Sequence, residues 1–219
     1  MRLTLYHYWR SSSSWRVRWA LAHKGIPCDF VPVDLLNGEA EAEEHRRRNP
    51  MGYVPALEIS AETNLSIAPV MLTESIAMIE FLEELYPKPS LLPGDSINRA
   101  RIRALAETIN AGTQPLQNLN AQFFHSDDAE KRKAWAQHWI REGLAAYEQI
   151  ASRTAGLFSV GDELSVADLC LIPQCYNARR NDIDLKAYPN IARIETTALQ
   201  TQSCKLSHPD RYEPGKTPV

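Results

Sequence analysis

The amino-acid sequence predicts a small α/β domain over residues 1–87 followed by an all-helical domain over residues 88–219. Two observations predict the first domain: apolar residues alternate as in strands on either side of a serine-capped helical segment, and two further strands and a helix follow. A third observation predicts the second domain, because the apolar spacing becomes helical beyond a proline-rich linker that begins at Pro87. The expected order of elements is therefore βαβ, then ββα, then helices.

The βαβ part occupies the beginning of the chain. Residues 2–9 alternate as a strand, and the serines that follow can cap a helix from about Ser13 to Lys24. Residues 29–35 alternate as a second strand, which we expect to lie parallel to the first. Residues 39–48 are almost wholly charged, so we expect an exposed helix or loop there rather than a core element.

The ββα part begins after a loop. Residues 49–55 contain two prolines and a glycine, and this composition is typical of a loop. Short strands are expected at residues 56–59 and 68–72. A helix with apolar residues at helical spacing then begins at residues 73–75 and ends at Pro87.

The second domain is expected to consist of helices joined by short connections. A serine at position 165 followed three residues later by Asp168 predicts a capping box at the start of a buried helix, so we assign this pair to folding rather than to chemistry. The expected helices cover residues 97–124, 128–152, 165–180 and 190–203, and a polar, proline-containing tail follows from His208.

Composition excludes several classes of function. The formal net charge is -3 and the pI is about 6.1, so no global positive field would attract nucleic acid or anionic lipid. No stretch approaches the roughly 18 consecutive apolar residues that a membrane-spanning helix needs, and the first residues do not have the pattern of a secretion signal. The 4 cysteines form no C-x-x-C pair, the histidines show no metal-ligand spacing, and we expect a reduced, cytoplasmic compartment.

The first candidate site lies between the first strand and the first helix, at Arg10, Ser11, Ser12 and Ser13. Unpaired N–H groups at a helix N-terminus stabilise an anion, and a serine hydroxyl there can donate a hydrogen bond to a thiolate and lower the pKa of the thiol. The alternative is that these serines serve only as caps and turn residues.

Two further candidate sites follow in the same domain. A cis bond between Val54 and Pro55 would present the backbone of Val54 to an extended peptide, whereas a trans proline would only begin an edge strand. At the last predicted helix of the domain, Glu74 could bind an ammonium group and the backbone at Ser75 a carboxylate, although ordinary helix capping explains the same residues. Together the three sites meet the requirements for binding the tripeptide γ-glutamyl-cysteinyl-glycine.

Several segments of the chain form a set of motifs. Ser11 to Arg18 reads SSSSWRVR, Asn49-Pro50-Met51 is followed by Val54-Pro55, Gln114 to Leu119 reads QPLQNL, and Val166 to Leu171 reads VADLCL; Asn177 to Arg180 and His208 to Arg211 complete the set. In these motifs, and over nearly its whole length, the sequence resembles the zeta class of glutathione transferases, the maleylacetoacetate isomerase family, whose signature near the N-terminus is SSCSWRVR.

The resemblance implies a thioredoxin-like first domain, glutathione as cofactor, a small dicarboxylate as substrate and a homodimer. It implies that Ser11 assists the glutathione thiol, with Ser12 and Ser13 beside it, and that the bond before Pro55 is cis. The other implied glutathione contacts are Val54, Glu74, Ser75, Gln114 and Asn118. The implied anchors for the substrate carboxylates are Arg10, Arg179 and Arg180.

The activity that the resemblance implies is glutathione-dependent cis–trans isomerisation of maleylacetoacetate to fumarylacetoacetate by reversible thiolate addition. Maleylpyruvate is an alternative substrate, general glutathione transfer an alternative activity, and a non-enzymatic adaptor an alternative of another class. Three features depart from the family pattern: Ser13 replaces a cysteine, Glu74 stands where glutamine is common, and residues 61–70 form a longer stretch.

Overall fold

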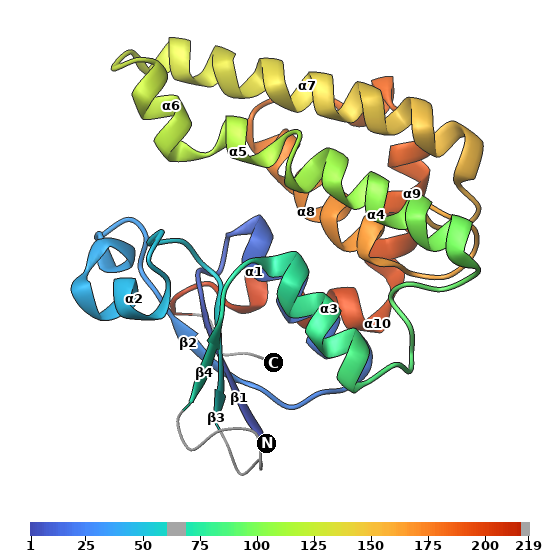
Figure 1. The fold of residues 1–219 in the computed structure, drawn as a ribbon. Helices are drawn as coiled ribbons and strands as arrows, with labels where there is room; N and C mark the ends of the chain where they lie inside the picture. Colours follow the sequence, from blue (N-terminus) through green and yellow to red (C-terminus); the bar gives the residue numbers. More distant parts are fainter. Residues whose placement is uncertain (61–68, 216–219) are drawn as a thin grey trace. The chain divides into compact units, whose positions relative to one another are not determined.

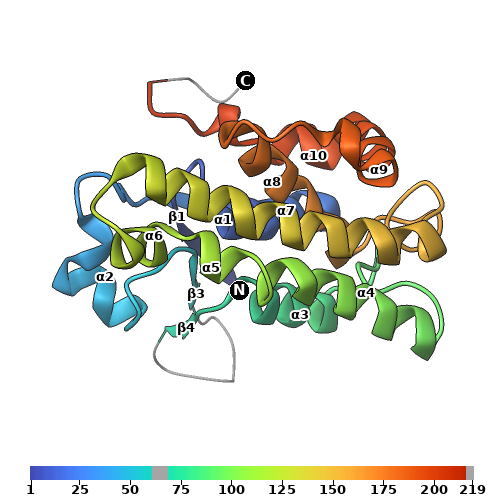
Figure 2. The ribbon, with the colours of Figure 1, turned by 90° about the horizontal axis from the view of Figure 1, so that it is seen from above.

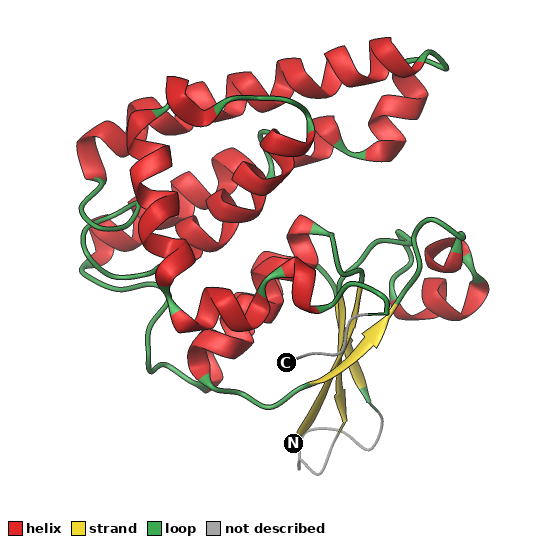
Figure 3. Ribbon diagram, turned by 180° about the vertical axis from the view of Figure 1, so that it is seen from behind, coloured by secondary structure: helices red, strands yellow, loops and turns green. Residues whose placement is uncertain are grey.

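The computed structural model describes residues 1–60 and 69–215, and the chain forms two compact units (Figure 1). One unit comprises Met1–Pro89 together with Gln202–Val219, and the other comprises Ser90–Thr201. The first unit contains the expected βαβ-ββα elements and the second is helical, as the colouring in Figure 3 shows, so the predicted fold class is confirmed. The expected second domain, residues 88–219, differs at its end, because the chain from Gln202 onward groups with the first unit.

A four-stranded mixed sheet forms the centre of the first unit, in the order β2-β1-β3-β4. β1 (Arg2–His7) pairs in parallel with β2 (Asp29–Pro32), and β3 (Ala56–Ser60) pairs antiparallel with both β1 and β4 (Val70–Leu72). β2 ends before the predicted residue 35 because the carboxylate of Asp34 accepts the backbone N–H groups of Leu36 and Asn37 and turns the chain. Of the stretch 61–70, which departs from the family pattern, residues 61–68 lie outside the described residues.

Three helices pack together in the first unit. α1 (Ser12–Lys24) contacts both α3 (Ser75–Leu85) and α10 (Gln202–Ser207), and Figure 1 shows these helices on one side of the sheet. Trp15 and Trp19 on α1 are almost fully buried, and their indole N–H groups donate to the hydroxyls of Ser207 (3.1 Å) and Ser203 (3.0 Å). These bonds explain why the C-terminal segment belongs to the first unit.

The last part of the C-terminal segment is not the purely polar tail that the sequence predicts. A 3-10 helix, η3 (Pro209–Arg211), follows α10, and the ring of Tyr212 packs edge-on against the rings of His7 and Phe30. Aromatic contacts of this kind stabilise a segment beyond the area that they bury. The mostly polar tail therefore contains one aromatic residue, Tyr212, that attaches it to the rest of the first unit.

The charged segment after β2 also differs from the prediction in one respect. It forms a 3-10 helix, η1 (Glu39–Glu41), and α2 (Glu43–Arg48), and most of its side chains are exposed. His45, however, is only 2% exposed. One side of this otherwise charged helix is thus part of the interior.

The second unit is helical, and α8 (Val166–Arg180), which contacts α4 (Ser96–Asn110) and α9 (Pro189–Gln200), is buried along most of its length. The other helices of this unit are α5 (Gln114–Gln117), α6 (Leu119–His125) and α7 (Ala129–Thr154), with a 3-10 turn, η2 (Leu185–Ala187), before α9. Figure 2 shows α4, α5 and α6 in succession along α7.

The prediction of a single helix over residues 97–124 is wrong, because the helical conformation is interrupted between α4 and α5 and again before α6. Thr113 donates its hydroxyl to the carbonyl oxygen of Thr108 at 2.8 Å, and Pro115 has no N–H to continue a helical ladder. Asn118 is extended, with φ -63° and ψ 153°. Local side-chain hydrogen bonds and proline thus outweigh an apolar periodicity that continues through the break.

The capping box at the start of α8 is present as predicted. Asp168 is fully buried and accepts four hydrogen bonds, from the N–H and hydroxyl of Ser165 and from the N–H and hydroxyl of Ser159, at 2.6–2.9 Å. Burial raises the pKa of the Asp168 carboxyl, and the hydrogen bonds oppose that rise. The pair therefore belongs to the interior of the second unit and not to an exposed site.

Candidate active site

The sheet topology brings the three predicted sites of the first unit to one edge. β3 is antiparallel to both β1 and β4, with Tyr6 opposite Ala56 and Leu57 opposite Leu72. The carboxyl ends of β1 and β4 therefore meet the amino end of β3. Ser11 follows β1, Val54 and Pro55 precede β3, and Glu74 follows β4.

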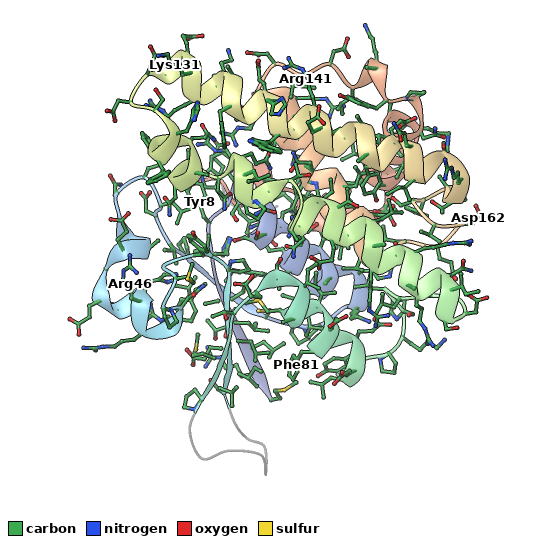
Figure 4. All side chains as sticks on the ribbon, turned by 45° about the horizontal axis from the view of Figure 1, so that its top comes forward. Tyr8, Arg46, Phe81, Lys131, Arg141 and Asp162 are labelled. Carbon is green, nitrogen blue, oxygen red and sulfur yellow. The ribbon has the colours of Figure 1, made fainter. Side chains whose placement is uncertain are left out.

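Ser11 is the N-cap of α1. Its hydroxyl oxygen accepts a hydrogen bond from the backbone N–H of Ser14 at 3.2 Å, and its own backbone N–H donates to the carbonyl oxygen of Tyr8, which Figure 4 labels, at 3.1 Å. The prediction that this serine is a cap is confirmed. Because the cap uses only an acceptor position of the hydroxyl, its hydrogen can donate to an anion at the helix N-terminus, and the two roles are compatible.

The neighbours of Ser11 occupy different environments. Ser12 and Ser13 are partly buried in the first turn of α1, whereas Ser14 is fully buried and its hydroxyl accepts from the backbone N–H of Tyr8 at 3.4 Å. The guanidinium carbon of Arg10 lies 5.2 Å from the centre of the Trp9 ring. The residue that would hold an anion, Ser11, is therefore preceded directly by an arginine in the sequence.

The bond between Val54 and Pro55 is cis, as predicted. Val54 is 9% exposed, and within residues 1–60 and 69–215 no hydrogen bond engages its backbone N–H or C=O. Buried backbone groups are nearly always hydrogen-bonded in proteins, so the edge at Val54 suits an extended peptide ligand.

Two side chains that are not among the predicted site residues hold the loop before this edge. Nε2 of His45 donates to the carbonyl oxygen of Tyr53 at 2.9 Å, and the side-chain amide of Asn49 donates to the same oxygen at 3.0 Å. Both residues are buried. Their position fixes the peptide immediately before Val54.

Glu74 is one of two non-glycine residues with positive φ among those that the structure describes, with φ 66° and ψ 114°. It is the N-cap of α3 but makes no capping hydrogen bond through its side chain, which is exposed. A strained backbone of this kind costs on the order of 1 kcal/mol and is frequent at ligand-binding sites. Plain capping therefore does not account for Glu74.

Ser75, the first residue of α3, connects this part of the site to α1. Its hydroxyl accepts a hydrogen bond from Nη1 of Arg16 at 3.2 Å, and both residues are buried. This bond ties the start of α3 to the helix that Ser11 caps. Arg16 belongs to the WRVR motif, and this bond gives that residue of the motif a structural role.

The second unit carries the other predicted contacts. Gln114 begins α5 and Asn118 is the N-cap of α6. The intervening Gln117 and Gln174 on α8 exchange two amide hydrogen bonds, at 2.7 and 3.0 Å, inside the unit. This pair fixes the short helix that carries Gln114.

The two candidate arginines of α8 lie in different surroundings. Arg179 forms a two-pronged ion pair with the nearly buried Glu195 of α9. This pair raises the pKa of the Arg179 guanidinium, and it occupies the donors that a substrate carboxylate would use. Arg180 is exposed at the last turn of the helix.

No group of side chains in the described part of the chain has the composition and placement of a metal site. Likewise, none of the helices within residues 1–60 and 69–215 combines the length and apolar character needed to cross a bilayer.

Comparisons with known protein families agree with this geometry. Residues 5–90 match the glutathione S-transferase N-terminal domain and residues 116–200 match the C-terminal domain of the same family. The chain therefore belongs to the glutathione S-transferase family.

Individual relatives indicate which class of glutathione transferase the chain is similar to. The chain is 46% identical over 207 residues to a protein named probable maleylacetoacetate isomerase 2 of Drosophila melanogaster, covering 94% of this chain and 87% of the relative. It is 44% identical to the maleylacetoacetate isomerase of Mus musculus, covering 94% and 92% of the two chains. The predicted relationship to zeta-class transferases and maleylacetoacetate isomerases is confirmed.

Solved structures give the same result. A maleylacetoacetate isomerase from Anaeromyxobacter dehalogenans 2CP-1 with bound glutathione has a TM-score of 0.88 at 43% identity, covering 98% of this chain and 97% of the other. A zeta-class maleylpyruvate isomerase has a TM-score of 0.87 at 33% identity, covering 97% and 99%. A maleylacetoacetate isomerase from Methylobacterium extorquens AM1, solved with malonate and glutathione, has a TM-score of 0.88 at 33% identity, covering 97% and 99%.

Proposed function

We propose that this protein is a glutathione-dependent cis–trans isomerase that converts maleylacetoacetate to fumarylacetoacetate. The observation that carries the proposal is the placement of three elements at one edge of the sheet: the Ser11 hydroxyl at the N-terminus of α1, the backbone of Val54 and the strained start of α3 at Glu74. Each matches one part of glutathione: the thiol, the peptide backbone and the γ-glutamyl group.

The residues at this edge suit the tripeptide chemically. The backbone N–H and C=O of Val54 can pair with the cysteinyl residue as a strand edge pairs with a peptide. The first N–H groups of α3 can receive the γ-glutamyl carboxylate, and the exposed carboxylate of Glu74 can bind the ammonium group beside it. Gln114 and Asn118 are proposed as further glutathione contacts from the second unit.

Bound glutathione supplies a thiolate that adds reversibly to the alkene carbon of the substrate, so that the former double bond can rotate before the thiolate leaves and glutathione is regenerated. Ser11 holds this thiolate by donating its hydroxyl hydrogen to the sulfur, and Ser12 and Ser13 line the same helix start. The positive end of α1 favours the ionised form of the thiol. A hydrogen-bond donor aimed at developing charge typically contributes about 3–4 kcal/mol to catalysis.

Arginine side chains are the proposed anchors for the carboxylates of the substrate. Arg10 is adjacent to Ser11, and Arg180 is exposed at the end of α8. A guanidinium can hold a carboxylate through two parallel hydrogen bonds. Arg179 is the weaker candidate of the three because Glu195 engages its guanidinium.

Maleylpyruvate is the second candidate substrate, because the chain is similar over 97% of its length to a zeta-class maleylpyruvate isomerase. The two substrates share the maleyl group on which the proposed chemistry acts. The test is a side-by-side assay of both substrates, each with and without glutathione. Turnover of maleylacetoacetate that requires glutathione supports the proposal, a strong preference for maleylpyruvate reassigns the substrate, and no turnover of either refutes it.

A homodimer is the assembly we propose from the family, and sedimentation of the purified protein tests it.

A non-enzymatic adaptor with this fold would have no need of glutathione. Absence of glutathione binding at millimolar concentration would favour that alternative.

A further inference from the structure

A buried arginine lies under the loop that connects β1 to Ser11. Arg18 on α1 is 1% exposed. Its Nη2 donates to the carbonyl oxygen of Trp9 at 2.8 Å and its Nη1 donates to that of Tyr8 at 3.4 Å. The oxygen of Tyr8 also accepts the backbone N–H of Ser11 at 3.1 Å. One guanidinium thus holds the two consecutive peptides, Tyr8–Trp9 and Trp9–Arg10, that lead into Ser11.

The same guanidinium is held from the C-terminal segment. Nε of Arg18 donates to the carbonyl oxygen of Ser207 at 3.3 Å, and the guanidinium carbon lies 4.6 Å from the centre of the Tyr212 ring. Nδ1 of His7 is 3.0 Å from Nη1 of Arg18. Because an arginine can only donate, Nδ1 accepts and the proton of the neutral imidazole is on Nε2.

The partners of Arg18 are electrically neutral. They are three carbonyl oxygens, one imidazole and one phenol ring, and no carboxylate forms an ion pair with Arg18 in the part of the chain that the structure describes. Burial lowers the pKa of the Arg18 guanidinium to about 9, so the side chain is still charged at neutral pH. A buried cation without an ionic partner is costly, and such groups are frequent at functional sites.

We propose that Arg18 is a positioning residue for the thiol site, and that it makes the C-terminal segment part of the structure that orients Ser11. This inference rests on the proposed role of Ser11. Arg18 holds the carbonyl groups of Tyr8 and Trp9, and these peptides fix the backbone that enters the N-cap. Ser207 and Tyr212 in turn hold Arg18 in place.

A purely structural tie is the competing explanation, and α1 offers a matched control for it. Lys24, at the other end of α1, is also a buried cation, and its amine donates to the carboxylate of Glu83 and to the carbonyl oxygens of Tyr86 and Pro89 at 2.6–2.8 Å. The two ends of a helix of 13 residues are separated by about 18 Å. Lys24→Met therefore removes a comparable set of bonds far from Ser11.

The experiment compares Arg18→Met, Arg18→Lys and Lys24→Met with the unmodified protein in three measurements: thermal stability, hydrogen exchange of the Ser11 amide without glutathione, and the thiol pKa of bound glutathione. We expect Arg18→Met to speed exchange of the Ser11 amide on the order of tenfold beyond Lys24→Met. We expect it also to raise the bound thiol pKa by about one unit, with kcat falling more than KM rises.

The conservative variant separates position from charge. Arg18→Lys keeps the charge but cannot reach both loop carbonyls and Ser207 together, so we expect faster Ser11 exchange and an intermediate thiol pKa. Tyr212→Ala, which leaves the arginine intact, should change the Ser11 exchange rate and the thiol pKa in the same direction as Arg18→Met, but by less. This variant replaces Arg18→Met in the comparison if Arg18→Met does not fold.

Two outcomes overturn the inference: variants of Arg18 that match Lys24→Met in Ser11 exchange and thiol pKa at equal loss of stability, or Arg18→Lys that equals the unmodified protein in both. Failure of the proposed function is distinguishable, because it would appear as absence of glutathione binding in the unmodified protein. The exchange of Ser11 is measured without glutathione and still reports whether Arg18 holds the loop.

Discussion

Replacing Ser11 by alanine tests the chemistry of the helix start. The hydroxyl of Ser11 accepts the backbone N–H of Ser14 at 3.2 Å and, in the proposed complex, donates to the glutathione thiolate. Loss of the cap should cost about 1 kcal/mol of unfolding free energy. Loss of a hydrogen bond to a charged group, about 1.5–3 kcal/mol, should raise the pKa of the bound thiol by about one to two units. Turnover near neutral pH should fall by about tenfold to a hundredfold.

Two further variants separate the cap from the thiol. Ser11→Asp keeps a good cap but places a negative charge beside the sulfur, so stability should be retained while the thiol pKa rises further. Ser13→Ala, inside the first turn, should change both quantities little. The assay is the ultraviolet absorbance of the thiolate of bound glutathione as a function of pH, with urea unfolding for stability. An unchanged thiol pKa in Ser11→Ala would refute the assigned role of Ser11.

Three other predictions concern buried polar groups. Asp168→Asn leaves donors without acceptors inside the second unit and should lower the free energy of unfolding in urea by about 3 kcal/mol, whereas the exposed Asp182→Asn should change it by under about 0.5 kcal/mol; similar losses would contradict the role of Asp168. His45→Leu should raise the KM for glutathione several-fold while His45→Gln, whose amide can replace the Nε2 donor, should restore it; equal KM values would show that the bond to Tyr53 does not position the site. Burial, followed by the charge of Arg18, lowers the pKa of His7 to about 3. The unfolded state therefore takes up a proton first as the pH falls below about 6.5, and the free energy of unfolding should decrease by up to about 5 kcal/mol by pH 3. His7→Gln should remove that part of the pH dependence, and an unchanged profile in urea unfolding would contradict it.

Local signals in the sequence predict the elements that carry the site. The serines before the first helix are predicted as possible caps, and the structure selects Ser11 among them; the pattern of Ser165 and Asp168 indicates the capping box that the structure contains. Apolar alternation places β1 and β3 correctly. The cis bond before Pro55 follows from the family resemblance and not from local pattern, because most X-Pro bonds are trans.

Features that depend on distant partners were predicted poorly. His45 lies in a run of charged residues, and its burial depends on the fold of the loop that presents the carbonyl of Tyr53. The C-terminal segment joins the first unit because Trp15 and Trp19 bind serines of α10, which periodicity along one segment cannot reveal. The second cis bond, before Pro89, likewise has no distinctive local signal.

The most direct test of the thiolate account is to measure kcat for isomerisation and the ionisation of bound glutathione over the same pH range, using the unmodified protein. If the ionised thiol at the start of α1 is the attacking group, the rate should rise with pH in parallel with the fraction of bound thiolate, and should vanish when glutathione is omitted. A rate that does not follow the thiolate fraction, or that persists without glutathione, would contradict the account.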